Sequence, residues 1–386
     1  MTDVAASAGP STTAPMEEHA ASLRALHQAL YELWQLGGNA LVGWMPTRTG
    51  LEVLSVPKIR LFNSKSLPRR VFAGDRLMGH QTFIEVSESL GIHSVELRLP
   101  HTIGNAPGEL PVALIEPVFA RFAVSKVDYH AVMLIDIVSF SRFSPEEQAC
   151  QLATLEFALN IALEAAREQG IDLDLDRSTT GDGFYVWNRN KGTTADVNLF
   201  VALVMFLTYH ALLKRRVKIA SAVPTIRTAV SIGSHYGYRA PNREGTRDAE
   251  YIVGDVTISL ARLMQQTAAE QIVVGEFQRP NDESGEMLSV ARFVDLVAHR
   301  LSEIKGLSIL GNQLQRFSLY LTGPRLADGG FGIQKLRIVD KHGFEHFGYN
   351  GKVNVFLEAG ETFYCGLQHT DLATAGPSSW EQFTQG

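Results

Sequence analysis

The sequence has 386 residues, 45% of them hydrophobic and 20% charged, which describes a globular chain long enough for two or three domains. Its formal net charge of −6 argues against a general nucleic-acid-binding surface, although a local basic pocket stays compatible with it. The two cysteines, Cys150 and Cys365, lie far apart and form no metal-ligand spacing. This usage points to a reducing compartment, and we expect a cytoplasmic protein.

The N-terminal part of the sequence gives structural signals but no functional motif. Residues 1–15 are small and polar, lack the apolar core of a signal peptide, and are predicted to be a disordered lead-in. A leucine stripe predicts a helix from residue 16 to about residue 41, ended by paired glycines. Short β-like runs follow over residues 50–100, and the Gly- and Pro-rich residues 101–111 read as a linker. Residues 16–110 thus form a region to which the sequence assigns no function.

A central segment begins with a strand that ends in a carboxylate. Residues 129–138 (YHAVMLIDIV) are a continuous apolar run ending in Asp136, which is typical of a strand buried on both faces. A capping box over residues 144–147 predicts the start of the next helix. In residues 175–187 (LDRSTTGDGFYVW), an Asp-Gly turn between β-prone stretches predicts a hairpin with Asp182 at its tip.

The elements that follow complete a mixed pattern. Residues 197–213 are nearly all apolar and long enough to cross a bilayer, but His210 interrupts them, and we expect a buried helix rather than a membrane span. A strand over residues 225–238 and a turn followed by a helix within residues 251–271 come next. Residues 291–321 alternate as strands around an Ile-Lys-Gly turn. This succession indicates an α+β or α/β sandwich with a mixed sheet.

Asp136 and Asp182 stand out by their placement. A carboxylate at a strand end or a hairpin tip is often a helix cap or a turn former, and that interpretation stays open for each of them taken singly. Together they could hold Mg²⁺ or Mn²⁺, because these ions commonly use one or two carboxylates plus substrate phosphates. Two such ions about 3.5–4 Å apart would suit an in-line displacement at phosphorus.

Five segments of the sequence, in their order, resemble the catalytic domain of class III nucleotidyl cyclases over roughly residues 125–322. No one of them is specific, because Gly-Asp pairs are common, but their order at domain-scale spacing is. They are DIVSFSRFS (136–144), TTGDGFYV (179–186), RTAVSIGSHYG (227–237), VGDVTISLARL (253–263) and EIKG (303–306). The resemblance implies an α+β fold, a ferredoxin-like α/β sandwich with a mixed sheet. An N-terminal α/β region and a small β-rich C-terminal module over residues 331–374 would accompany it.

The resemblance also implies roles for single residues. Asp136 and Asp182 match the two aspartates that bind a pair of Mn²⁺ or Mg²⁺ ions, and Ile137 would add its backbone carbonyl. Phe140 and the neighbouring backbone would line the triphosphate of a nucleoside triphosphate substrate.

Two basic residues match the charges that act on the phosphates in this family. Arg262 matches the arginine that stabilises charge developing on the α-phosphate, and Lys305 matches the lysine that holds the triphosphate. Taken without the resemblance, they are a solvated helix residue and a turn residue. In the family one catalytic domain supplies the aspartates and a second supplies the arginine and the lysine, so one such domain per chain implies a homodimer with two shared active sites.

The sequence departs from the family where the base would be read. Ser178, with Arg177 beside it, stands where purine cyclases typically carry a lysine, and Tyr251 replaces the usual Asp, Thr or Cys. Ile258 stands in place of the asparagine that orients the ribose. Because Tyr251 is bulky, the pocket would favour a one-ring base, and polar partners at Ser178 or Arg177 would reach a pyrimidine edge.

These departures resemble the pyrimidine cyclases of bacterial Pycsar anti-phage defence, and residues 331–374 resemble a C-terminal sensor domain found on some defence-associated enzymes. A dimerisation or packing appendage is an equally open interpretation of that segment. The sequence therefore predicts a uridylate cyclase that makes cyclic UMP, with cyclic CMP as the second choice, and binds neither nucleic acid nor membrane. An adenylate or guanylate cyclase with an unusual base pocket, or a catalytically silent nucleotide-binding sensor, is the alternative.

Overall fold

The chain divides into two compact units in the computed structural model, and each is described by itself. Unit 1 comprises Met1–Val127 and Tyr236–Ile252, and unit 2 comprises Asp128–His235 and Val253–Gly386. The predicted lead-in over residues 1–15 lies outside the described residues. The structure describes residues 19–63, 72, 76–218, 222–239, 250–309, 311–340, 342–358, 360–372 and 381–382.

Unit 1 contains a three-stranded antiparallel sheet, in the order β1-β2-β3, with helices packed around it. The predicted first helix forms but ends before the paired glycines, because Gln35 and Leu36 already adopt left-handed backbone angles. The predicted linker carries Leu110, which is fully buried in the unit's core. The elements are α2 (Ala20–Trp34), η1 (Gln35–Gly37), β1 (Asn39–Pro46), β2 (Gly50–Pro57), α3 (Lys58–Asn63), α4 (His80–Leu90), β3 (Ser94–Arg98) and α5 (Val112–Phe119).

Unit 2 is built on a mixed sheet, which has 12 strands in the part of the chain that the structure describes. Its main path is β12-β13-β15-β9-β7-β4-β6-β5, in which β7 and β9 are parallel and the β4–β6 and β5–β6 pairs are antiparallel. The strands are β4 (Val124–Ile137), β5 (Leu175–Thr179), β6 (Gly183–Asn188), β7 (Ile226–Arg239), β8 (Glu250–Val253), β9 (Ile272–Gly275), β12 (Ser308–Ile309), β13 (Asn312–Thr322), β14 (Lys335–Val339), β15 (Glu345–Leu357), β16 (Thr362–Cys365) and β17 (Glu381–Gln382). A separate hairpin is formed by β10 (Gln278–Pro280) and β11 (Met287–Ser289).

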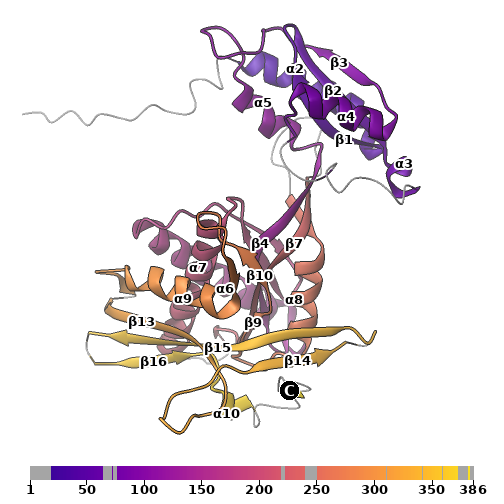
Figure 1. The fold of residues 1–386 in the computed structure, drawn as a ribbon. Coiled ribbons are helices and arrows are strands. Elements are labelled where there is room, and N and C mark those ends of the chain that lie inside the picture. The colour runs from indigo at the N-terminus through magenta and orange to yellow at the C-terminus, as the bar shows by residue number, and fades with distance from the viewer. Residues whose placement is uncertain are drawn as a thin grey trace, which may run out of the picture. The chain divides into compact units, whose positions relative to one another are not determined.

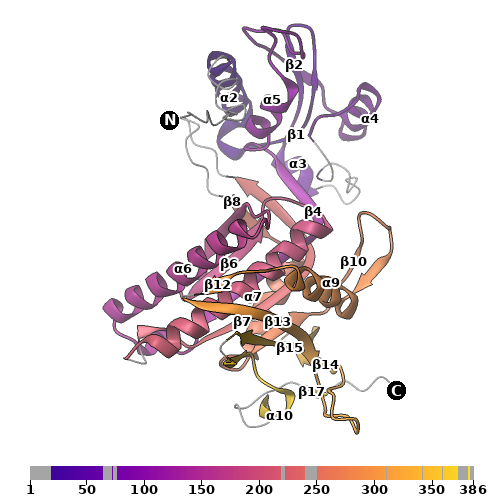
Figure 2. The ribbon, with the colours of Figure 1, turned by 90° about the vertical axis from the view of Figure 1, so that its left-hand side faces the viewer.

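Helices cover both faces of this sheet (Figures 1 and 2). One face carries the main core with α6, α7 and α9, and the other face carries α8. The predicted capping box is present, with the Ser144 hydroxyl and the Glu147 carboxylate bonded to each other's backbone amides. The helices are η3 (Phe140–Arg142), α6 (Pro145–Glu168), α7 (Thr193–Arg216), α8 (Asp255–Gln265), α9 (Val290–Ser302) and α10 (His369–Leu372). The predicted mixed α+β class is thus confirmed.

The apolar helix α7 is a core element of unit 2. It is long and apolar enough to cross a membrane, yet 89% of its most hydropathic window is buried within the protein. Its side chains pack in one cluster with the sheet and with α6 and α9. The expectation of a buried helix is confirmed by this packing.

The prediction of strands over residues 291–321 was wrong in its first half. Residues 290–302 form the helix α9, and only the part from residue 308 onward is β structure. The buried side chains show why, because Val290, Phe293, Val294, Val297 and Leu301 recur with helical spacing. The apolar residues of this segment therefore follow the helical period of 3.6 residues and not the alternation of a strand.

The C-terminal segment over residues 331–374 contributes strands to the same sheet. Within it, β15 pairs with β13 and β9 along the main path and also with β14 and β16. Its side chains at Val353, Val355 and Leu357 belong to the core of unit 2. The predicted domain boundaries stay a prediction, but this segment shares its core with the region that resembles a cyclase.

Candidate active site

The strand β4 and the hairpin β5–β6 hold the two predicted aspartates side by side. Asp136 is the register partner of Gly183, and the Ile137 amide donates to the Asp182 carbonyl at 2.9 Å. Because side chains alternate across a strand, the Asp136 side chain lies on the face of the sheet that carries α8, while those of Ile135 and Ile137 lie in the core on the other face. A Cβ at position 183 would lie 1.9 Å from the Ile135 carbonyl oxygen, so only glycine allows this approach.

The hairpin tip explains the polar residues that precede Asp182. Gly181 has φ +100°, a conformation that glycine adopts without strain. The Thr179 hydroxyl accepts from the Gly181 amide at 3.0 Å, and the Thr180 hydroxyl donates to Asp182 Oδ1 at 3.2 Å. The two threonines thus shape the turn and orient the carboxylate that it presents.

Asp136 has a cationic partner that the sequence did not single out. Arg227 of β7 donates from Nε to Asp136 Oδ2 at 2.6 Å and from its terminal nitrogen to the Thr267 carbonyl at 3.2 Å. Burial raises the pKa of Asp136, Arg227 opposes that rise, and the negative charge of Asp182 adds to it. Asp182 is therefore close enough to Asp136 to disfavour the ionised form of the Asp136 carboxyl.

A cavity of about 210 Å³ opens beside these groups. Tyr185 of β6 crosses toward α8, where its hydroxyl donates to the Thr257 carbonyl at 3.1 Å. Burial and the nearby Asp136 both raise the pKa of this phenol, which keeps it protonated. The lining residues are Leu134, Asp136, Thr180, Tyr185, Arg227, Ala261, Met264 and Gln265.

The aspartate pair fits a divalent cation. Among the described residues, no group of three or more His, Cys, Asp or Glu side chains could hold a metal ion by itself. Mg²⁺ usually binds through one or two carboxylates and completes its shell with substrate phosphates and water. Asp136, whose pKa is raised partly by the negative charge of the adjacent Asp182, lines a cavity and forms with Asp182 such a partial site, which a cation would stabilise.

The residues predicted to act on the phosphates lie elsewhere in the same chain. Arg262 lies on α8, half-buried, with Nε 3.3 Å from Asp340 Oδ2. Lys305 is exposed in the turn between α9 and β12. Phe140 begins η3 and packs partly against the core, and its carbonyl accepts from the Gln148 side chain. Asp136 lines the cavity, whereas Asp182, Arg262 and Lys305 do not.

The predicted base-reading residues are distributed over different surfaces. Ser178 is half-buried and pairs across the hairpin with Tyr185, so it shares a face with the candidate site. Arg177 points to the other face, where it bonds Glu156 at 2.5 Å and Asn160 at 3.2 Å on α6. Tyr251 belongs to unit 1, where its ring stacks on Tyr238 with centroids 5.3 Å apart.

Two contributors escaped the sequence reasoning. Arg227 lies in one of the five segments that resemble cyclase motifs but has no predicted role there, and Tyr185 has no predicted role beyond the hairpin strand. A signal for Arg227 exists, because an arginine close to the buried residues Ile226, Ala229 and Val230 of the same strand needs a carboxylate partner. No comparable signal marks Tyr185, since a tyrosine in a hairpin strand is ordinary.

Comparisons with known proteins place cyclases beside this chain. No family model and no curated protein match it. Among solved structures, it is similar to the guanylyl cyclase Cya2, with 11% identity over 59% of this chain and 92% of that chain and a TM-score of 0.36. It is also similar to the guanylate cyclase domain from Catenaria anguillulae in complex with GTP, with 16% identity over 42% of this chain and 94% of that chain and a TM-score of 0.30. For the adenylyl cyclase CyaB from P. aeruginosa, the identity is 15% over 43% of this chain and 93% of that chain, and the TM-score is 0.29. Likenesses this distant do not decide the function, which is argued from the site.

Proposed function

We propose that this protein is a cytoplasmic nucleotide cyclase that converts a nucleoside triphosphate into a 3′,5′-cyclic nucleotide and pyrophosphate. The observation that carries the proposal is that β4 and the β5–β6 hairpin hold Asp136 and Asp182 side by side, with Asp136 and Arg227 lining a cavity. Both aspartates come from motifs that resemble those of class III cyclases, and the fold brings them together from separate elements.

The reaction forms a bond between the ribose 3′ oxygen and the α-phosphorus and breaks the bond to the β-phosphate. Bound divalent cations would favour loss of the hydroxyl proton and neutralise the phosphates. Asp136 and Asp182 would hold those ions, and Arg227 would keep Asp136 ionised and oriented. Arg262 would neutralise charge that develops on the α-phosphate as pyrophosphate leaves.

We further propose that two chains share each active site. In one chain Arg262 and Lys305 do not line the cavity that Asp136 lines, which is consistent with their acting on substrate held by a partner. A homodimer would then have two equivalent sites, each built from both chains.

For the base, the proposal is a pyrimidine, UTP before CTP. Support comes from the small polar Ser178 on the same face as Tyr185 and from the absence of the family's lysine at that position. The resemblance to Pycsar cyclases extends the proposal to a second messenger in anti-phage defence. An adenylate or guanylate cyclase with an unusual pocket is the alternative within the same chemistry.

The experiment is incubation of the purified full-length protein with each of the four nucleoside triphosphates and Mn²⁺, followed by mass detection of products. Cyclic UMP or cyclic CMP as the main product supports the full proposal, whereas cyclic AMP or cyclic GMP supports only the cyclase chemistry. Ser178→Lys tests base choice directly, because it restores the lysine typical of purine cyclases and should raise purine turnover relative to pyrimidine turnover.

A catalytically silent nucleotide sensor is the second candidate, and one observation favours it. Two of the charges required for catalysis already have ion-pair partners within the chain, Asp136 with Arg227 and Arg262 with Asp340. A sensor would bind a nucleoside triphosphate, measured by calorimetry, without forming any cyclic product. Formation of any cyclic nucleotide by the unaltered protein above the level measured for Asp136→Asn would exclude this candidate.

A further inference from the structure

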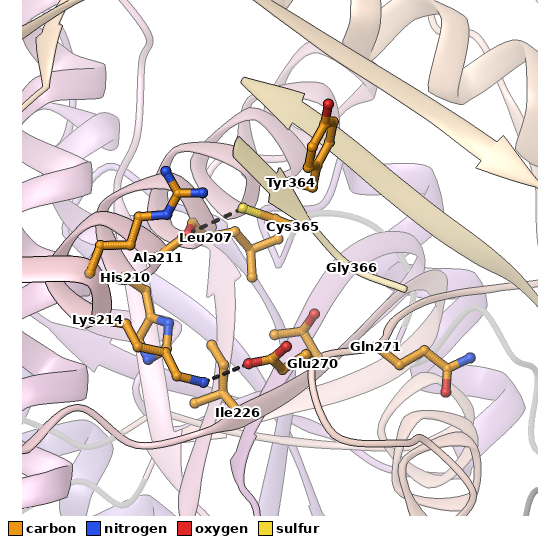
Figure 3. A pocket seen from close by; sticks show the side chains of 12 residues that line it. Leu207, His210, Ala211, Lys214, Ile226, Glu270, Gln271, Tyr364, Cys365 and Gly366 are labelled. Carbon is orange, nitrogen blue, oxygen red and sulfur yellow. Dashed lines mark hydrogen bonds and ion pairs between the residues drawn. The ribbon is translucent and has the colours of Figure 1, made fainter. Parts of the chain in front are cut away.

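A second cavity, of about 330 Å³, lies on the opposite face of the sheet in unit 2. Three consecutive residues of β7 separate it from the candidate active site: Ile226 and Thr228 line this cavity, and Arg227 between them lines the other. Figure 3 shows the residues that surround it, which come from α7, β7, the turn before β9 and β16. They are Leu207, His210, Ala211, Lys214, Arg215, Ile226, Thr228, Glu270, Gln271, Tyr364, Cys365 and Gly366.

Two of the residues that line the cavity each have a buried polar atom without a hydrogen-bond partner, namely His210 Nε2 and Thr228 Oγ1. The side chains are almost completely buried, with 5% of His210 and 1% of Thr228 exposed. Burial lowers the pKa of His210 to about 4, so the ring is neutral, and it bonds the Pro224 backbone. With one ring nitrogen engaged in that bond to a carbonyl, Nε2 is left as an acceptor. An unsatisfied buried acceptor is costly, so these two atoms are suited to a ligand that supplies N–H or O–H groups.

The inner wall of the cavity is apolar and chemically inert. Leu207, Ala211 and Ile226 contribute hydrocarbon surface. Cys365 directs its thiol at the Leu207 carbonyl at 3.6 Å, and burial raises its pKa to about 12 (Figure 3). The thiol therefore stays protonated and does not act as a nucleophile. Apolar walls with two polar atoms at fixed positions are typical of pockets for flat organic ligands.

The rim of the cavity carries two cations whose partners are exposed. Lys214 Nζ lies 2.5 Å from Glu270 (Figure 3), and Arg215 lies 2.9 Å from Glu361. The two carboxylate side chains are 55% and 54% exposed, so these ion pairs contribute little stability. A phosphate could replace either carboxylate at small cost, because the released carboxylate is already largely hydrated.

From these groups, we infer that the cavity is a binding site for a nucleoside monophosphate. The heteroaromatic base would lie between the apolar walls and donate to His210 Nε2, with Thr228 as its second polar contact. The phosphate would bind Lys214 and Arg215 at the rim. This site is distinct from the cavity that Asp136 lines and does not depend on the function proposed for that cavity.

Isothermal titration calorimetry on the full-length protein, without divalent metal, tests the site with UMP, CMP, AMP and GMP as probes. We expect at least one to bind, and we expect the matching free nucleoside and ribose 5-phosphate to bind at least about tenfold more weakly, because each lacks one half of the contacts. Failure of all four monophosphates to bind overturns the inference.

Variants show which cavity is occupied. Thr228→Val and His210→Phe should each weaken binding several-fold, and Thr228→Val should leave the melting temperature unchanged or higher, because it removes an unpaired buried hydroxyl. Asp136→Asn is the matched control in the other cavity and should leave the affinity unaltered. Binding that survives both cavity variants, or that Asp136→Asn abolishes, contradicts the inference.

Discussion

Arg227 donates to Asp136 at 2.6 Å, and it does so from the strand that neighbours the aspartate's own strand in the sheet. The same guanidinium bonds the Thr267 carbonyl, so its position is fixed at two ends. The contact opposes the rise in the pKa of Asp136 that burial and the negative charge of Asp182 cause. The guanidinium thus favours the ionised form of Asp136, which is the form that binds a cation.

Replacing either aspartate by its amide should abolish cyclic nucleotide formation. Asp136→Asn and Asp182→Asn each remove one anionic ligand while preserving shape, so the fold should persist and Mn²⁺ affinity should fall. Turnover by mass detection and Mn²⁺ binding by electron paramagnetic resonance are the measurements. Asp174→Asn, an exposed carboxylate just before the same hairpin, is the matched control and should behave as the unaltered chain. Robust turnover by either active-site variant would refute the assignment.

Arg227→Gln should move the acid limb of the pH–rate profile to higher pH. Arg227 lowers the pKa of Asp136, so its loss raises that pKa further and leaves less carboxylate ionised at a given acid pH. The profile of kcat/KM against pH, recorded at saturating Mn²⁺, measures the shift. Arg227→Lys retains the charge and should shift the limb less. An acid limb that stays in place in Arg227→Gln would show that Asp136 does not titrate in this range.

Mixing two inactive variants should restore activity if the sites are shared between chains. Arg262→Ala should lower kcat on the order of 10²–10³-fold, as expected for loss of a transition-state donor. In a mixed dimer of Asp136→Asn and Arg262→Ala chains, one site carries both defects and the other carries neither. An equal mixture should regain roughly a quarter of the unaltered activity, since about half of the dimers are mixed and each has one intact site. No recovery after subunit exchange would place all catalytic groups of a site within one chain.

The buried pair His130 and His235 should make unit 2 sensitive to acid. The rings stack 4.9 Å apart, with His130 Nδ1 2.6 Å from His235 Nε2, and burial lowers the pKa of His130 from 6.5 to about 4. Between pH about 4 and pH 6.5, His130 is protonated in the unfolded chain but not in the folded chain. Stability is therefore full above pH about 6.5 and falls by roughly 3 kcal/mol as the pH drops toward 4.

His130→Gln isolates this contribution, because glutamine does not titrate. Its free energy of unfolding should be lower than that of the unaltered chain at pH 7.5, and the difference between the two should shrink as the pH falls. Denaturant titrations at several pH values provide the comparison, and the other titratable groups cancel in the difference. A constant difference across the range would mean that His130 does not carry the acid sensitivity.

The sequence was most informative where local chemistry determines structure. The capping box at Ser144 and the hairpin at Asp182 depend on neighbouring residues, so they could be predicted without knowing the fold. The meeting of Asp136 and Asp182 followed from motif order. Tertiary partners were not predictable, because nothing in the sequence near Arg227 or Arg262 indicates which carboxylate will lie beside it.

The helix α9 shows a different limit. Its apolar residues satisfy a helical period, but a short window with several β-branched residues also suits a strand, and the decision is made by packing against β13 and α7. The substrate residues are limited in the same way, since Ser178 and Arg177 are adjacent in sequence but occupy opposite faces of the hairpin. Because side chains alternate between the two faces of a strand, residues that are adjacent in the motif, such as Arg177 and Ser178, point to opposite faces.

The long strand β15 bears on how a C-terminal sensor could act. It lies between β9 and β13, so a chain shortened at residue 324 would lose the middle of a sheet and not a detachable regulator. Deletion of residues 325–386 is therefore expected to cause misfolding, and it would not reveal whether residues 331–374 regulate activity. Point substitutions at the exposed Phe344 would instead test residues 331–374 while leaving β15 in the sheet.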